Sequence, residues 1–122
     1  MKFMTIVKSS EQAGPPPMAL MQAIGQLGEE AVKAGVLVEM GGLLPSAKGF
    51  RVRIEKGKLS VIDGPFAEAK EVIGGYAVYD LPSRTEALDW CRRFMELHLT
   101  HWPQFEGESE VRQIFGPGDM PG

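Results

Sequence analysis

The sequence predicts an α+β fold with the ferredoxin-like order βαββαβ and an additional β-hairpin inserted in its middle. Two segments repeat apolar residues in steps of three and four, which is the period of an amphipathic helix. Short segments rich in Val, Ile, Phe and Tyr surround them and are separated by glycine and proline. The 122 residues suffice for one domain with its own core, so we expect a single domain over residues 1–122.

The first βαβ unit is predicted over residues 2–40. Residues 2–8 form an apolar strand, and the prolines at 15–17 open a helix, because proline is tolerated in a first helical turn. Gly35 caps the end of this helix, and residues 36–40 form the second strand. The predicted apolar stripe of the helix consists of Met18, Met21, Ile24, Gly28, Ala31 and Val32.

The inserted hairpin is predicted from strict alternation. Phe50, Val52 and Ile54 alternate with charged residues, which is typical of a half-buried strand. Lys56-Gly57 forms a tight turn, and residues 59–62 return as the partner strand.

The second βαβ unit begins with a strand at residues 72–81, where Gly74-Gly75 indicates a bulge. Ser83 starts a capping box before the second helix. Residues 109–115 form the last strand, and we expect the tail to fray from about residue 116. The predicted stripe of the second helix consists of Ala87, Leu88, Cys91, Phe94, Met95 and His98.

Composition and charge exclude several classes of protein. The net charge of −3 disfavours a nucleic-acid partner, which requires a basic surface. No apolar run approaches the roughly 20 residues of a membrane span, and the short apolar start, interrupted by Lys8, is no signal segment. The single cysteine, Cys91, excludes an internal disulfide and fits a cytoplasmic location. The glycine pairs lack the spacing of a nucleotide-binding loop, so we expect no cofactor.

The strands are apolar on both faces, although two helices can cover only one face of the sheet. Met4 and Ile6 alternate with Phe3 and Val7 in the first strand, for example. A second, identical subunit is the simplest cover for the remaining face, so we expect a homodimer.

Residues 63–71, Asp-Gly-Pro-Phe-Ala-Glu-Ala-Lys-Glu, form the most distinctive segment of the chain, called the signature segment below. It joins a turn to an aromatic residue and four charged residues, in a connection between strands where functional groups are often placed. Further characteristic segments are Leu43–Lys48, Gly74–Tyr76 and Glu86–Trp90. With these residues the chain closely resembles the YCII-related family of small bacterial proteins, which carries a DGPF motif.

The resemblance implies a dimeric α+β barrel in which the sheets of two subunits face each other. The family has no agreed reaction. Some relatives are thought to use a histidine–aspartate pair whose histidine lies in the first helix; this chain has no histidine there, and only Asp63 matches. Similar domains also occur beside or fused to sigma factors of the extracytoplasmic type, which implies a regulatory role with such a partner.

Asp63 has two interpretations. Its carboxylate can cap the turn that it starts by accepting hydrogen bonds from backbone N–H groups. It can also act as a general acid or base in a pocket, with a pKa tuned by burial and by a neighbouring cation.

The other charged residues near the signature segment also have two interpretations. Glu68, Lys70 and Glu71 form either a solvated cluster or part of a pocket for a polar ligand. Arg51 and Arg53 point to one face of their strand, where they either keep an exposed edge soluble or clamp an anion.

His98 and His101 lie three residues apart at a helix end, a weak metal motif without a third ligand, so we predict no metal. His98 is the better candidate for a proton carrier near neutral pH. The leading hypothesis is a homodimer that binds a small polar organic ligand, with Asp63 and His98 as catalytic candidates and Arg51, Glu68, Lys70 and Glu71 as ligand-binding candidates. Any chemistry would be cofactor-free acid–base catalysis. The alternative is a non-catalytic regulatory module.

Overall fold

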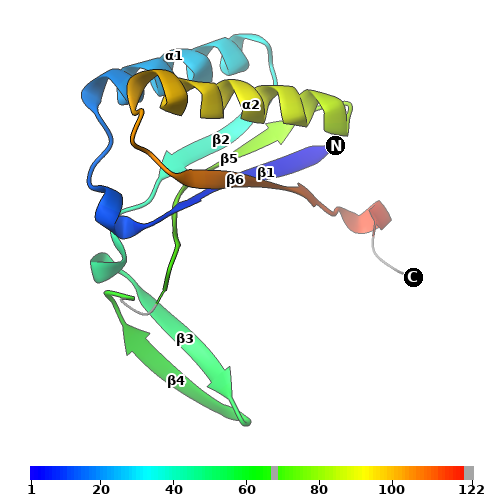
Figure 1. Ribbon diagram of the computed structural model, residues 1–122. Coiled ribbons are helices and arrows are strands. Elements are labelled where there is room, and N and C mark those ends of the chain that lie inside the picture. The colour runs from blue at the N-terminus through cyan, green and yellow to red at the C-terminus, as the bar shows by residue number, and fades with distance from the viewer. Residues whose placement is uncertain (67–68, 120–122) are drawn as a thin grey trace.

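The computed structural model describes residues 1–66 and 69–119, which form two helices on one face of an antiparallel sheet (Figure 1). The strands of this sheet are β1 (Lys2–Ser9), β2 (Leu37–Gly42), β5 (Val72–Asp80) and β6 (Gly107–Ile114). The helices are α1 (Met18–Lys33) and α2 (Arg84–His101), and the hairpin consists of β3 (Phe50–Glu55) and β4 (Lys58–Asp63). The 3-10 turns are η1 (Glu11–Ala13), η2 (Ser46–Lys48) and η3 (Pro117–Asp119).

The strands lie in the order β2-β5-β1-β6, and every neighbouring pair is antiparallel. This order is compatible with a ferredoxin-like fold, and the predicted sequence of elements with an inserted hairpin is confirmed. The hairpin forms a separate two-stranded sheet that extends away from the side of the main sheet opposite the helices (Figure 1). Neither helix of the described chain is both long and apolar enough to cross a membrane.

The helix ends follow the predicted caps. Ser83 Oγ accepts a hydrogen bond of 3.2 Å from a backbone N–H in the first turn of α2. Gly35 has a φ of 75°, a conformation that glycine adopts without a steric penalty. Its N–H donates to the carbonyl of Val32 at 2.9 Å, and the N–H of Val36 donates to that of Ala31 at 3.0 Å. These two bonds close α1 in a Schellman motif.

The buried face of α1 matches the predicted stripe only in part. Gly28 and Ala31 are buried as predicted. Met18 and Val32 are 74% and 62% exposed, whereas Leu20 and Leu27 are buried. Seven residues make almost two whole helical turns, so Leu20 and Leu27 share a face, and Met18 lies on the opposite side of the helix. In α2, Leu88 is likewise exposed rather than buried. Several apolar stripes are possible in each sequence, and the position of the sheet selects one.

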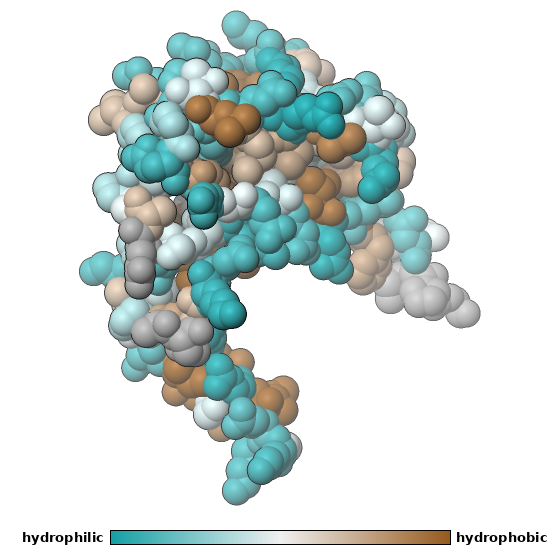
Figure 2. Space-filling view, in the orientation of Figure 1, coloured by the Kyte–Doolittle hydropathy of each residue, from teal (hydrophilic) through white to brown (hydrophobic). Residues whose placement is uncertain are grey.

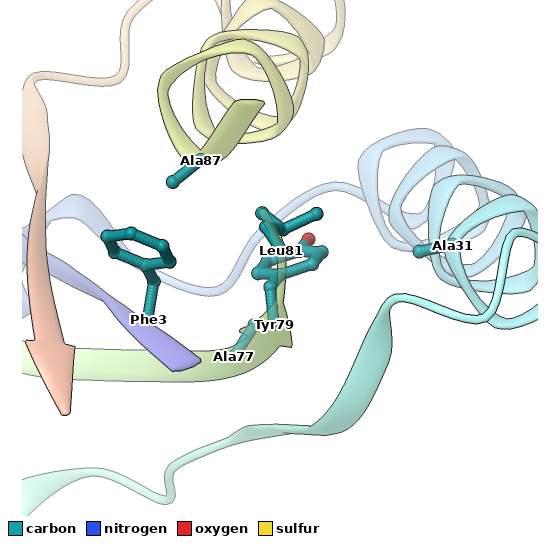
Figure 3. Close-up of a cluster of buried hydrophobic side chains, with 6 residues drawn as sticks. All are labelled: Phe3, Ala31, Ala77, Tyr79, Leu81 and Ala87. Carbon is teal, nitrogen blue, oxygen red and sulfur yellow. The ribbon is translucent and has the colours of Figure 1, made fainter. Parts of the chain in front are cut away.

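The core lies between the sheet and the helices and centres on Phe3, Tyr79 and Leu81 (Figure 3). Ala31 of α1 and Ala87 of α2 belong to the same cluster, and their small side chains let both helices approach the sheet. Phe3 and Tyr79 are opposite each other in the β1–β5 register. Burying a side chain the size of Phe contributes about 1.5–3 kcal/mol, so these residues hold the helices on this end of the sheet.

A β-bulge interrupts the pairing of β1 with β5. Val7 pairs with Gly75, but the next residue, Lys8, pairs with Ile73, so Gly74 is the extra residue. The predicted bulge is confirmed at this position.

The hairpin turn is also confirmed, because Lys56 and Gly57 have positive φ values of 50° and 76°, as a type I′ turn requires. The predicted half-burial of its strands is not found within one chain. Five apolar side chains share one face of the hairpin and are 58–74% exposed, and hydrophobic residues are visible on this arm in Figure 2. They are Phe50, Val52, Ile54, Leu59 and Val61.

Residues 117–119 of the tail that we expected to fray form the short turn η3. The N–H of Gly116 donates to the carboxylate of Asp119 at 2.9 Å and closes this turn. Residues 120–122 lie outside the described residues.

Candidate functional site

A cavity of about 680 Å³ lies between the helices and the sheet, beside the filled core. The sheet register explains why space remains there. Next to the large pair Phe3–Tyr79, the helix-facing positions of the central strands carry Thr5 opposite Ala77. The following positions carry Gly75 in β5 and Gly42 in β2. These small side chains leave a gap under helices that the large residues hold in place.

Aromatic side chains form the wall of the cavity near the end of α2. Phe94, His98, Trp102 and Phe105 all line it. Ring centroids are 4.9 Å apart between Phe94 and His98, 4.8 Å between His98 and Phe105, and 5.0 Å between Trp102 and Phe105. The side chain of Trp102 is buried, as expected for a residue that covers the helix end. Leu20, Met21 and Ile24 of α1 border the same cavity.

His98 lines this cavity, and one of its ring nitrogens has no hydrogen-bond partner among the described residues. It is only 6% exposed, and its Nδ1 lies 3.1 Å from the carbonyl oxygen of Phe94. A carbonyl oxygen can only accept, so Nδ1 carries the proton and Nε2 has a lone pair. Burial lowers the pKa of His98, which favours this neutral form.

Thr5 is the second buried polar side chain in the lining, and it is also 6% exposed. Its hydroxyl has no hydrogen-bond partner among the described residues. In the described part of the chain, every polar side-chain atom that is shut off from solvent has a hydrogen-bond partner. The unpaired hydroxyl of Thr5 is therefore not shut off, and it faces open space. Sequence reasoning missed Thr5, although a lone hydroxyl between Phe3 and Val7 on one strand face was a visible signal.

The signature segment packs against the turn at residues 45–49. The N–H of Gly64 donates to the carbonyl of Gly49 at 2.9 Å, and the N–H of Phe66 donates to Ser46 Oγ at 3.1 Å. The carboxylate of Glu11 accepts from Ser46 N–H at 2.6 Å and from Ser46 Oγ at 2.5 Å. These bonds, above all that from the Ser46 side chain, lower the pKa of Glu11. Glu11 also borders the cavity, so this chain of bonds connects the signature segment to the cavity mouth.

Asp63 lies exposed at the end of β4, opposite Phe50 in the hairpin register. Within the described residues, no backbone N–H of the turn that follows donates to its carboxylate. The N–H groups of Gly64 and Phe66 bond elsewhere, as described above, and Pro65 has none. The turn is held by residues 45–49 instead.

The other candidates that the structure describes lie around the signature segment rather than in the cavity. The guanidinium of Arg51 stacks over the ring of Phe66, 3.7 Å from its centroid. Lys70 and Glu71 are exposed, and Glu68 lies outside the described residues. Among the described candidates, only His98 lines the cavity; Asp63, Arg51, Lys70 and Glu71 do not.

The face of the sheet without helices carries an ion-pair network. Lys8 Nζ lies 2.8 Å from Glu110 Oε1, and Arg112 Nη1 lies 3.1 Å from Glu110 Oε2. The hydrogen bond to Glu110 raises the pKa of Lys8, and the bonds from Lys8 and Arg112 lower that of Glu110. Met4 and Ile6 lie on the same face, so it combines apolar residues with both signs of charge.

Other reactive groups do not form a second site in the described residues. These residues contain no cluster of three or more His, Cys, Asp or Glu side chains able to hold a metal ion. Cys91 is buried, and burial raises the pKa of its thiol, which disfavours the nucleophilic thiolate.

Comparison with known proteins places the chain in a family. A protein of Rhizobium meliloti (strain 1021), itself described as uncharacterised, is 33% identical over 104 residues, which cover 84% of this chain and 80% of the relative. The family model of the YCII-related domain matches residues 1–97, from β1 into α2, and so includes the signature segment and most of the cavity lining. The chain therefore belongs to the YCII-related domain family.

Proposed function

We propose that this protein binds a small organic molecule in the cavity between its helices and its sheet, and that it acts as a homodimer. The observation that carries the binding proposal is the pairing of this cavity with two buried polar side chains, Thr5 and His98. Its volume of about 680 Å³ falls in the range of roughly 300–1,000 Å³ that is usual for small-molecule sites.

His98 supplies the chemistry in this proposal, because its neutral ring can accept a proton from a bound ligand at Nε2. Asp63 is the alternative catalytic residue. In that version the ligand lies at the signature segment, with Arg51, Lys70 and Glu71 around it.

A thermal-shift screen of small organic molecules against three proteins separates these versions. A ligand that binds only the native state raises the melting temperature. We expect a shift that is lost in His98→Gln and retained in Asp63→Asn. A shift lost only in Asp63→Asn would place the ligand at the signature segment. The absence of any shift in the wild type across a broad library would refute the binding proposal.

The homodimer proposal rests on two surfaces. Large exposed apolar patches usually mark interfaces, and a two-stranded hairpin is at best marginally stable alone, so the apolar hairpin face needs a cover. The open face of the main sheet carries Lys8, Glu110 and Arg112 together. A patch with both signs of charge can place unlike charges opposite each other when two copies meet, and a two-fold interface between identical subunits requires such self-complementarity.

Two neighbouring substitutions test this dimer. Val61 lies on the apolar face of the hairpin, and Ser60 lies on the other face, paired with Arg53. We expect sedimentation equilibrium to give a dimer for the wild type and for Ser60→Glu, but a monomer for Val61→Glu. A monomeric wild type would refute the homodimer. The hairpin face would then be free for another protein, which favours the regulatory module with a sigma factor as partner.

A further inference from the structure

We propose that the ligand of the cavity is a flat, mainly apolar aromatic molecule that carries a hydroxyl group, a class that includes phenols and naphthols. This inference rests on the proposed function, and it names the class of molecule that the cavity selects. Three features of the lining support it: its apolar walls, its hydrogen-bonding groups and its charge.

The walls suit an aromatic ring. Phe94, Trp102 and Phe105 line the cavity from α2 and the segment that follows it, and the aliphatic side chains of Leu20 and Ile24 line it from α1. Aromatic rings pack well in offset or tilted arrangements, and the existing rings already adopt tilts between 36° and 59°. Gly75, Gly42 and Ala77 leave part of the sheet floor without large side chains, and a flat molecule can lie along the sheet there, bordered by Val7 and Met40.

The polar groups suit a hydroxyl. His98 Nε2 is an acceptor, since Nδ1 carries the proton, and it therefore needs a donor from the ligand. The Thr5 hydroxyl can donate or accept. A ligand hydroxyl is both donor and acceptor, so it can satisfy either buried group, whereas an ether or a hydrocarbon cannot donate to His98.

The charges disfavour an anionic ligand. Glu11 is the only charged residue among the described lining residues, and its carboxylate is negative. No Lys or Arg of the described chain lines the cavity to pair with a carboxylate or phosphate. Burying an unpaired charge is strongly unfavourable, so sugar acids and other carboxylates should be excluded.

Four probes test this selectivity: naphthalene, 2-naphthol, 2-naphthoate and gluconate. The first three share one ring system and differ only in the polar group. Binding is followed by the indole N–H resonance of Trp102 in a Trp90→Phe background, because Trp102 lines the cavity and Trp90 does not. We expect 2-naphthol to bind more tightly than naphthalene by roughly two- to twelvefold, the net effect of one hydrogen bond. We expect 2-naphthoate and gluconate to bind more weakly than naphthalene.

Three substitutions locate the binding. Thr5→Val removes the hydroxyl at nearly constant shape and should reduce the preference for 2-naphthol over naphthalene. Gly42→Leu should abolish binding, because a Cβ at Gly42 meets no atom within 4 Å and a larger side chain there occupies the cavity. Gly25→Leu is the matched control: its Cβ also meets no atom within 4 Å, but Gly25 does not line the cavity.

The outcomes separate this inference from the proposed function. Preferential binding of 2-naphthol that Gly42→Leu abolishes and Gly25→Leu preserves supports both. Binding of 2-naphthoate or gluconate in preference to 2-naphthol, still abolished by Gly42→Leu, overturns the ligand class and leaves the cavity as a binding site. Absence of binding by all four probes overturns the ligand class, and the proposed function falls with it only if the broad library also gives no shift. Binding that Gly42→Leu leaves unchanged overturns the cavity as the binding site and so overturns both. Thr5→Val is nearly isosteric, so its result stands even where Gly42→Leu does not fold.

Discussion

Replacement of Gly64 by alanine tests how the signature segment is held. A Cβ at this position would overlap the carbonyl oxygen of Ser46 and would lie 2.6 Å from its carbonyl carbon and 3.2 Å from the carbonyl oxygen of Gly49. All three are backbone atoms, which no rotamer change can move away. The segment must therefore separate from residues 45–49, and it then loses the bonds that Gly64 and Phe66 donate to that turn.

The expected loss follows from these contacts. Two hydrogen bonds at about 0.5–1.5 kcal/mol each and the stacking of Arg51 on Phe66 at about 0.5–1 kcal/mol give a decrease of about 1.5–4 kcal/mol in the free energy of unfolding. Urea unfolding followed by circular dichroism measures this change. Gly25→Ala is the control, because its Cβ meets nothing within 4 Å and alanine should stabilise the middle of α1 by about 0.5–1 kcal/mol. A Gly64→Ala protein as stable as the wild type would refute this account of the signature segment.

Two further substitutions probe single side chains. Ser46→Ala removes the hydroxyl between Glu11 and Phe66. The free energy of unfolding should fall by about 1 kcal/mol, because the bond from the Phe66 N–H is lost. The pKa of Glu11 should rise toward its ordinary value in an NMR titration, and an unchanged Glu11 pKa would contradict the assigned bonds. His98 has a lowered pKa in the folded protein, so the unfolded chain takes up the proton first as the pH falls below about 6.5. The free energy of unfolding therefore decreases progressively below that pH. His98→Phe should lack this part of the loss in urea unfolding at pH 7.5 and pH 5.5, and equal losses in both proteins would contradict the burial effect.

Much of the fold is predictable from local residue patterns. The bulge at Gly74, the turn at Lys56-Gly57 and the caps at Ser83 and Gly35 are all found where the sequence predicts them, because each depends on a few neighbouring residues. The buried face of α1 is not predictable in this way. It depends on where the sheet lies, and the sequence of α1 has more than one apolar stripe.

The candidate site is less predictable, because it depends on space rather than on reactive groups. Charged residues dominate the signature segment and therefore dominate a reading of the sequence. The cavity instead arises where small residues such as Thr5, Ala77 and Gly75 come together through strand pairing over long sequence separations. His98 was identified because its position in α2 and its chemistry are both visible in the sequence. The lone hydroxyl of Thr5 is also visible there, but the space beside it follows only from the register.

The signature segment and the cavity are linked through one turn, and this link can be measured. Gly64 and Phe66 contact residues 46–49, Ser46 binds Glu11, and Glu11 borders the cavity. If the signature segment acts on the cavity only by positioning its mouth, Gly64→Ala and Ser46→Ala disturb the same element. Their effects on 2-naphthol affinity should then be non-additive, with the double variant no weaker than the weaker-binding single variant. Fully additive losses would instead mean that the two residues influence binding independently. The signature segment would then have to contact the ligand directly.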